Sequence, residues 1–325
     1  MGNGSRLLGI GGYRPRCLVA NEEIGARIGV DSAWIRRRSG IASRHVAAAD
    51  ETVLSMAAEA GRKALAAAGI VPEQVDVVLL ASISYLYQTP AAAPRVAHEI
   101  GAPGAAALDI SAACSGFGYG LALADSMVRA GSARHVLVIG AERMTDIIDP
   151  ADPAAAFLFG DGAGAAVVGP AGTRGIFPTV WGSDGALADL IAHRRSWLDL
   201  RDGPETPWPT MLMQGTEVFR WALRELPAVV EAVLKAAGLS PADLRGFVPH
   251  QANLRIIEGV AKAAELPAGV AIARDVTTTA NTSAASIPLA LERLVERGEV
   301  TGGDLVLLLG FGAGMTYSGQ VVAVP

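Results

Sequence analysis

AAGIVPEQVDVVLLAS, residues 67–82, returns later in the chain as AAGLSPADLRGFVPHQ, residues 236–251. The two stretches lie 169 residues apart (236 − 67), and the Ala-Ala-Gly, a following aliphatic residue, the proline and an apolar run all align. Each copy predicts a helix that ends at the glycine, a short turn and then a buried strand. Repetition of this unit indicates that the chain contains two copies of one fold.

A second internal match supports the duplication. FLFGDGAGAAVVGP from Phe157 and LLLGFGAGMTYSGQ from Leu307 share Gly-x-Gly-Ala-Gly, 150 residues apart (307 − 157). Chance could produce one such match in a chain rich in alanine and glycine. Two matches in the same order are harder to explain by chance. We therefore predict two similar α/β halves, residues 1–175 and 176–325.

The two halves alternate helical and strand-like segments. Helical patterns cover residues 52–68, 116–130, 218–237 and 287–297, and strand-like runs such as VDVVLLAS, HVLVIGAE and DLVLLLG lie between them. This alternation favours layered sheets covered by helices. The stretch 183–209, with its tryptophans, prolines and mixed charge, reads as a long excursion that lines or covers something.

The composition excludes several classes of protein. The 325 residues are 51% hydrophobic and carry a net charge of −5, so no overall positive field attracts nucleic acid or an anionic membrane. No apolar run approaches the roughly 20 residues of a membrane span, and the first residues lack the core of a signal peptide, which predicts a cytoplasmic protein. The two cysteines, Cys17 and Cys114, form no disulfide framework and no metal-ligand pattern, so an important cysteine here acts as a thiol.

Cys114 lies in DISAACSGFGYG, residues 109–120, between a strand-like run and a helical pattern. At such a turn the free amide groups and the helix dipole lower the pKa of a thiol. Free cysteine is also one of the most buried residue types, so position alone leaves a nucleophile and a packed side chain equally open.

His250 and Asn281 are two further polar candidates. His250 ends the strand of the second repeat, where a lone histidine is more often structural, but strand ends of related halves tend to meet at one crevice. Asn281, in TTTANTSAASIP, also fits a turn or a helix cap. A cysteine, a histidine and an asparagine together form a set that can carry out thioester chemistry.

These motifs, taken in order along the chain, resemble the β-ketoacyl-acyl-carrier-protein synthase III family of the thiolase superfamily. The resemblance rests on GYRPRCLVANEEI, WIRRRSGIASRH, SAACSGFGYGL, FLFGDGAGAAVVGP, VPHQANLRII, NTSAASIP and GFGAGMTYSG. It implies a five-layered αβαβα fold and a homodimer. It also implies that Cys114 is the nucleophile, that His250 and Asn281 complete the catalytic set, and that the amides of Cys114 and Ala313 form an oxyanion hole.

The implied reaction is a decarboxylating Claisen condensation. An acyl starter passes from a thioester, for which acyl-CoA is expected, to Cys114, and malonyl-acyl carrier protein then attacks it to begin a fatty acid or an aromatic polyketide. An acyltransferase that moves the acyl group to an alcohol or amine without condensation is the alternative. Neither a metal nor a redox cofactor is expected, and coenzyme A and the carrier protein are the expected partners.

The resemblance assigns outer residues as well. Trp34 and Arg38 match coenzyme A contacts, and a basic patch for the carrier protein consists of Arg220, Arg255 and Lys262. Three positions depart from the family pattern. Thr89 replaces an aromatic residue that closes the partner's acyl channel, Pro153 replaces an arginine near the adenine, and Ala280 replaces a glycine, which costs about 1 kcal/mol if its φ is positive.

Overall fold

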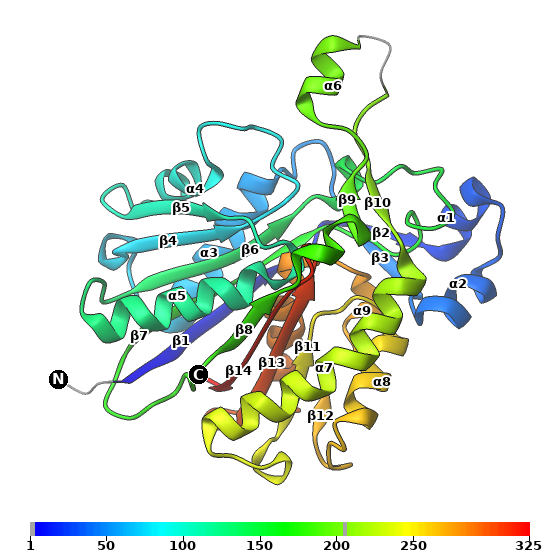
Figure 1. The fold of residues 1–325 in the computed structure, drawn as a ribbon. Coiled ribbons are helices and arrows are strands. Elements are labelled where there is room, and N and C mark those ends of the chain that lie inside the picture. Colours follow the sequence, from blue (N-terminus) through cyan, green and yellow to red (C-terminus); the bar gives the residue numbers. More distant parts are fainter. Residues whose placement is uncertain (1–3, 204–206) are drawn as a thin grey trace.

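Two five-stranded sheets form the frame of the protein in the computed structural model, which describes residues 4–203 and 207–325 (Figure 1). The first sheet has the order β1-β7-β6-β4-β5 and the second β12-β11-β13-β14-β8. The strands of the first are β1 (Gly4–Tyr13), β4 (Val77–Ala81), β5 (Ala106–Ile110), β6 (Val136–Glu142) and β7 (Gly162–Ala171). Those of the second are β8 (Val180–Ser183), β11 (Gly246–Pro249), β12 (Ala271–Ile272), β13 (Leu305–Gly312) and β14 (Thr316–Ala323).

The two sheets repeat one topology. In each, three strands run parallel (β5-β4-β6 and β12-β11-β13) and two antiparallel strands complete the sheet. Equivalent strands begin 169 residues apart, β4 and β11 at 77 and 246 (246 − 77) and β6 and β13 at 136 and 305 (305 − 136). The predicted duplication is therefore confirmed.

The glycine-rich match aligns positions that are not equivalent in the fold. Leu307 lies within β13, whereas Phe157 precedes β7. Residues 143–161 connect β6 to β7, but only residues 313–315 connect β13 to β14. The long first connection shifts the alignment, and the boundary between the halves near residue 175 stays a prediction.

Six helices complete five layers. α3 (Val53–Ala68) and α4 (Ala92–Ile100) cover the outer face of the first sheet, and α7 (Gly215–Ala237), with α8 (Leu254–Ala263) packed beside it, covers the second. α5 (Gly116–Ala130) and α10 (Ser286–Glu296) lie between the two sheets and contact strands of both. This is the expected αβαβα arrangement, and all four predicted helices are present.

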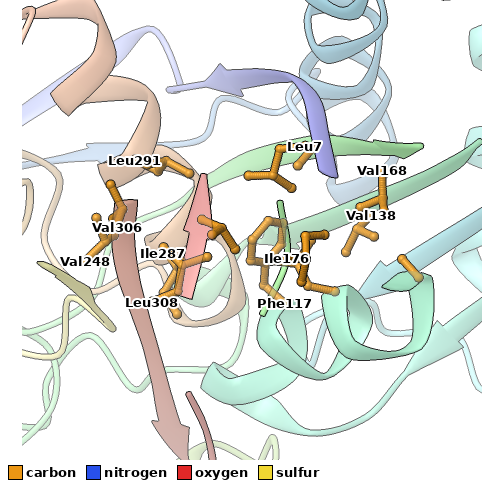
Figure 2. Packing of buried hydrophobic residues seen from close by; sticks show 14 of the residues in the cluster. Leu7, Phe117, Val138, Val168, Ile176, Val248, Ile287, Leu291, Val306 and Leu308 are labelled. Carbon is orange, nitrogen blue, oxygen red and sulfur yellow. The ribbon is translucent and has the colours of Figure 1, made fainter. Parts of the chain in front are cut away.

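The middle layer contains a core shared by the halves (Figure 2). Phe117 and Leu121 of α5 are fully buried in one cluster with Leu291 of α10, and strands of both sheets add valines and leucines such as Val138 and Leu308. Burying one such side chain contributes about 1.5–3 kcal/mol. The two halves are therefore held together by one buried core between their sheets.

Smaller elements surround the ends of the sheets. They are β2 (Cys17–Ala20), β3 (Ser43–Val46), β9 (Ile191–His193), β10 (Met211–Met213), α1 (Asn21–Ile28), α2 (Ser32–Ser39), α6 (Trp197–Asp202) and α9 (Val276–Thr279). β9 and β10 pair, and α6 projects from the rest of the ribbon on the arm between them (Figure 1). None of the helices in the described ranges is long and apolar enough to cross a membrane.

Candidate active site

A small pocket of about 40 Å³ lies where the two halves meet. Cys114, His250, Asn281 and Ala313 all line it. The rest of its wall is mainly apolar: Ile83, Ala113, Met144, Phe159, Ile191, Met211, Met213, Val218, Ala252, Phe311 and Gly312. Residues more than 160 positions apart in the sequence thus share one site, and Ile191 shows that part of the 183–209 excursion does line something.

Cys114 sits in a tight turn between β5 and α5. A 3-10 turn over Ala113–Ser115 leads directly into the helix, and Ala113 adopts a φ of 45°, which L-residues rarely adopt. Gly312 approaches this turn closely, because a Cβ atom there would lie 2.8 Å from the Cβ and 3.2 Å from the Sγ of Cys114. The end of β13 thus needs glycine for the sulfur to occupy its place.

The Cys114 thiol is protonated in this environment. Protein atoms surround the sulfur although part of the residue is accessible, and this burial raises the thiol pKa to about 12. The negative charge of Glu142 raises it as well, and a hydrogen bond from Sγ to Ser283 Oγ, 3.4 Å long, opposes the shift. The sequence-based expectation of a lowered pKa is wrong here, because desolvation is the largest effect on this thiol.

His250 follows directly on β11 and is held from two sides. Its backbone N–H donates to Leu309 O over 2.7 Å, and Nδ1 lies 2.7 Å from Ser286 Oγ. Because Ser286 Oγ accepts from the Gln251 N–H, its own proton can point to Nδ1, which leaves the proton of a neutral ring on Nε2. Burial lowers the His250 pKa to about 3, so the ring is neutral at physiological pH.

The side chain of Asn281 is oriented by the same segment. Its Oδ1 accepts a 2.8 Å hydrogen bond from the backbone N–H of Ser283, so its NH2 group remains as the donor. Its own N–H donates to Leu158 O over 2.9 Å. The preceding residue, Ala280, has φ 59° and ψ −162°, a conformation that is essentially reserved for glycine. The positive φ considered from the sequence is therefore present.

The predicted coenzyme A contacts lie together on α2, outside the pocket. The Arg38 guanidinium stacks 5.2 Å from the centre of the Trp34 ring, which forms a T-shaped pair with Phe157. Pro153 is exposed, and beside it Asp152 pairs with Arg194 over 2.9 Å. A guanidinium is thus present near this position despite the proline.

The predicted basic patch spans the neighbouring helices α7 and α8. Arg220, Arg255 and Lys262 are all exposed. Arg220 pairs with Glu217 over 2.8 Å, and Arg255 lies over the ring of Phe219. The three side chains face solvent, as a docking surface requires.

Thr89 does not line the pocket of its own chain as far as the described residues show. It is exposed on the loop between β4 and α4, next to the exposed Tyr87. The expectation that residue 89 acts on a partner subunit stays a prediction.

Several residues at the site escaped the sequence reasoning. Ser283 and Ser286 lie within NTSAASIP. No role was predicted for them because small polar residues are common in turns. Glu142, at the end of β6, is fully buried and accepts a hydrogen bond from Ser283 Oγ over 2.9 Å. A lone acid at the end of HVLVIGAE was the available signal. Nowhere in 4–203 or 207–325 do three or more His, Cys, Asp or Glu side chains form a group that could hold a metal.

Comparison with known proteins identifies the family. The description of 3-oxoacyl-[acyl-carrier-protein] synthase III matches residues 108–185, and that of its C-terminal part matches residues 234–324. A β-ketoacyl-[acyl-carrier-protein] synthase III of Streptomyces glaucescens is 51% identical over 99% of this chain and 96% of its own. One from Streptomyces coelicolor is also 51% identical, with the same coverage.

Solved structures agree with the sequence relatives. The priming β-ketosynthase of the R1128 polyketide pathway superposes with a TM-score of 0.97 at 45% identity, covering 99% of this chain and 96% of its own. The 3-oxoacyl-(acyl carrier protein) synthase III of Pseudomonas aeruginosa gives a TM-score of 0.91 at 36% identity, with 99% and 98% covered. The chain therefore belongs to the 3-oxoacyl-[acyl-carrier-protein] synthase III family.

Proposed function

We propose that this enzyme condenses an acyl starter with malonyl-acyl carrier protein, with loss of carbon dioxide, to initiate fatty acid or polyketide synthesis. The observation that carries the proposal is the convergence of Cys114, His250 and Asn281 on one apolar pocket. The family membership and the similarity to a priming ketosynthase support the same reaction.

Acylation of Cys114 is the first step. The deprotonated sulfur attacks the thioester carbonyl of the starter, and the amides of Cys114 and Ala313 stabilise the oxyanion. When the tetrahedral intermediate collapses, the carbon–sulfur bond to the donor breaks and the donor thiol leaves with a proton. Acyl-Cys114 remains, in contact with the apolar wall of the pocket.

Decarboxylation and condensation follow. Nε2–H of His250 and the NH2 group of Asn281 donate to the thioester carbonyl of the malonyl group as enolate charge develops. Carbon dioxide leaves, the new carbanion attacks the acyl-Cys114 carbonyl, and the sulfur is released. The product is a 3-ketoacyl carrier protein. Because these donors stabilise the charge, we expect no metal or redox cofactor.

Two measurements test this reaction. Intact-mass analysis after incubation with a panel of acyl-CoA and acyl-carrier thioesters should show one acyl adduct, and Cys114→Ala should form none. Carbon dioxide release from malonyl-acyl carrier protein should then require the acylated enzyme. Adduct formation followed by transfer to an alcohol or amine, without carbon dioxide, would instead support the acyltransferase alternative.

The identity of the starter depends on residues at the mouth of the site. Trp34 and Arg38 offer an aromatic face and a guanidinium for coenzyme A, and Arg194 beside Pro153 offers another positive charge. Thr89 is smaller than an aromatic residue and should leave space for a branched or longer acyl chain. The acyl panel decides this, since a strict preference for acetyl would overturn the large-channel proposal.

The exposed basic patch on α7 and α8 is proposed to receive the acidic carrier protein, because opposite charges steer encounter. Arg255→Glu should raise the KM for malonyl-acyl carrier protein and weaken its salt dependence. Arg62→Glu is the matched control, since that exposed arginine lies on α3, the helix that covers the other sheet. Equal effects of both variants would contradict this docking site.

A homodimer is proposed from the first sheet. β5 is an edge strand of that sheet, and Leu108 on it is 41% exposed. Tyr87 and Trp197 expose further apolar surface nearby, and both line one open cleft. A second copy would cover this surface, so Leu108→Asp should shift the sedimentation of the enzyme toward monomer. A cytoplasmic location stays a prediction.

A further inference from the structure

Glu142 is a buried acid without a cation. Its side chain at the end of β6 is 0% exposed, and no lysine or arginine of the described chain forms a salt bridge with it. Its Oε2 accepts hydrogen bonds from the hydroxyls of Ser82 and Ser84 and from the backbone N–H groups of Ile83 and Ser84. Burying a carboxyl group costs several kcal/mol unless it is well bonded, so a function for this acid is worth seeking.

The other oxygen of this carboxyl group points to the nucleophile. Ser283 Oγ donates to Glu142 Oε1 over 2.9 Å, and the same Oγ accepts from Cys114 Sγ over 3.4 Å. The three groups form a continuous chain, Sγ–H to Oγ–H to Oε1. It crosses the interface between the halves, because Cys114 and Glu142 belong to the first repeat and Ser283 to the second.

His250 is occupied elsewhere. Its Nδ1 is held by Ser286, and its ring forms no hydrogen bond with Cys114 Sγ in the described part of the chain. The nearest charged neighbours of Glu142 in sequence, Arg143 and Asp146, pair with each other over 3.2 Å. The serine-acid chain is therefore the route along which hydrogen bonds lead away from the sulfur.

We propose that Glu142, acting through Ser283, accepts the proton of Cys114 when the acyl donor arrives. The Sγ–H bond breaks and its proton passes to Ser283 Oγ, while the original Ser283 proton passes to Glu142 Oε1. The products are a thiolate, a serine that donates to it, and a neutral carboxylic acid. When the carbon–sulfur bond to the donor breaks, Ser283 Oγ–H gives its proton to the leaving thiolate and takes the proton back from Glu142 Oε1, so atoms and charge balance. This inference rests on the acylation step proposed above.

The electrostatics of the site fit this relay. Burial raises the pKa of Glu142, which makes it a stronger base than an exposed glutamate, and burial also keeps the Cys114 thiol protonated. A proton must therefore leave the sulfur during the reaction. Transfer to Glu142 moves the negative charge from the carboxylate to the sulfur without adding net charge to the apolar site.

The test measures the single-turnover rate of Cys114 acylation by an acyl-CoA between pH 6 and 9, by rapid quench and intact mass. Glu142→Gln and Ser283→Ala should each acylate about 100-fold more slowly at pH 7, within the range of general-base effects. The deficit should shrink as hydroxide replaces the lost base. Ser82→Ala, which removes a bond to the other oxygen of Glu142, should change the rate less than about three-fold.

The sign of the Glu142→Gln effect separates the relay from a passive charge. A fixed carboxylate raises the thiol pKa, so its removal would make Cys114 more reactive. Faster acylation of Glu142→Gln, or an unchanged rate in Ser283→Ala, would overturn the proposal. The double variant should be no slower than the slower single variant, because both residues serve one path.

Two controls keep the outcomes distinct. Thermal unfolding identifies a variant that fails to fold; if Glu142→Gln does, the Ser283→Ala rate decides alone. If the unmodified enzyme forms no adduct on Cys114 with any thioester, the proposed function itself fails. If the unmodified enzyme is acylated and both variants match its rate at pH 7, only the relay is wrong.

Discussion

The turn that carries Cys114 and the turn that carries Ser283 are equivalent in the two halves. Each begins with a residue at unusual positive φ, 45° at Ala113 and 47° at Ser283, forms one 3-10 turn and continues into a central helix. Counted from these residues, Ala284 occupies the position of Cys114 (284 − 114 = 170). The same backbone thus presents a nucleophile in one half and a methyl group in the other.

Glycines on the strands of each half lie against the turn of the other half. A Cβ at Gly140 of β6 would collide with the backbone of Ala284, and one at Gly310 of β13 would lie 3.0 Å from Ser115 Cα. Each strand therefore packs against the turn of the other half. The duplicated frame therefore holds the nucleophile in one copy and the donors His250 and Asn281 in the other.

Moving the cysteine between the two turns gives the largest expected effect. Cys114→Ala should fold, because Ala284 shows that the turn accepts alanine, but should lose the acyl adduct and at least about 10³-fold of condensation activity. The double variant with Ala284→Cys should stay inactive, since Ala284 does not line the pocket among the described residues. Intact mass and product formation measure both; an adduct on residue 284 that condenses would contradict the different roles of the two turns.

Closing the gap beside the nucleophile should cost less. In Gly312→Ala, the new methyl group would lie 2.8 Å from Cys114 Cβ, so the sulfur must move, and displacement of about 1 Å lowers the rate about 100-fold. Gly140→Ala instead places a methyl group against the backbone of Ala284, in the turn without a nucleophile, so it should lower stability more than the acylation rate per folded enzyme. Urea unfolding and acylation kinetics distinguish them; a larger acylation defect in Gly140→Ala would contradict the assignment.

The buried groups of the two halves should make the folding stability depend on pH in opposite directions. His250 has a folded pKa of about 3, below its ordinary 6.5, so below pH 6.5 the unfolded chain binds a proton that the folded chain refuses. Each pH unit there costs about 1.4 kcal/mol, or about 2 kcal/mol from pH 7 to 5. His250→Gln should lack this loss in urea unfolding, and an equal loss in the variant would contradict a buried neutral ring.

Cys114 should produce the mirror effect at high pH. Its folded pKa of about 12 exceeds its ordinary 9.0, so above pH 9 the unfolded chain loses a proton that the folded chain keeps. Stability should therefore fall as pH rises above 9, and Cys114→Ala should remove this part of the fall. A matching slope in the variant would show that other groups dominate at high pH.

Much of the frame could be predicted from the sequence. The helix-turn-strand repeat at an offset of 169 residues identified equivalent strands correctly, because helix ends and buried strands leave local patterns. The glycine-rich match failed as an alignment, since close packing of Gly162 and Gly312 arises from different neighbours in space. The periodicity of a sequence predicts local secondary structure. It does not predict which distant segment packs against a given glycine in the fold.

The site was predictable in part for the same reason. The positions of Cys114 and His250 at predicted strand ends identified them as candidates. The roles of the relay partners Ser283 and Glu142 depend on a contact between the halves, which the sequence does not show. The thiol pKa could not be inferred from a helix terminus either, because it depends on how many protein atoms surround the sulfur. Burial of this kind is a property of the assembled fold.

The smallest expected change in stability concerns the segment that precedes the turn of the second half. The first half arrives through β5, whereas the second arrives through α9 and Ala280, whose φ of 59° and ψ of −162° strain an L-residue. Ala280→Gly should therefore increase the free energy of unfolding by about 1 kcal/mol, after the loss of one buried methyl group and the greater entropy of unfolded glycine. Ala285→Gly, at an ordinary φ of −75°, is the matched control and should destabilise. If Ala280→Gly destabilises as much as Ala285→Gly, the second turn is not strained, and the departure from glycine at this position has no energetic cost.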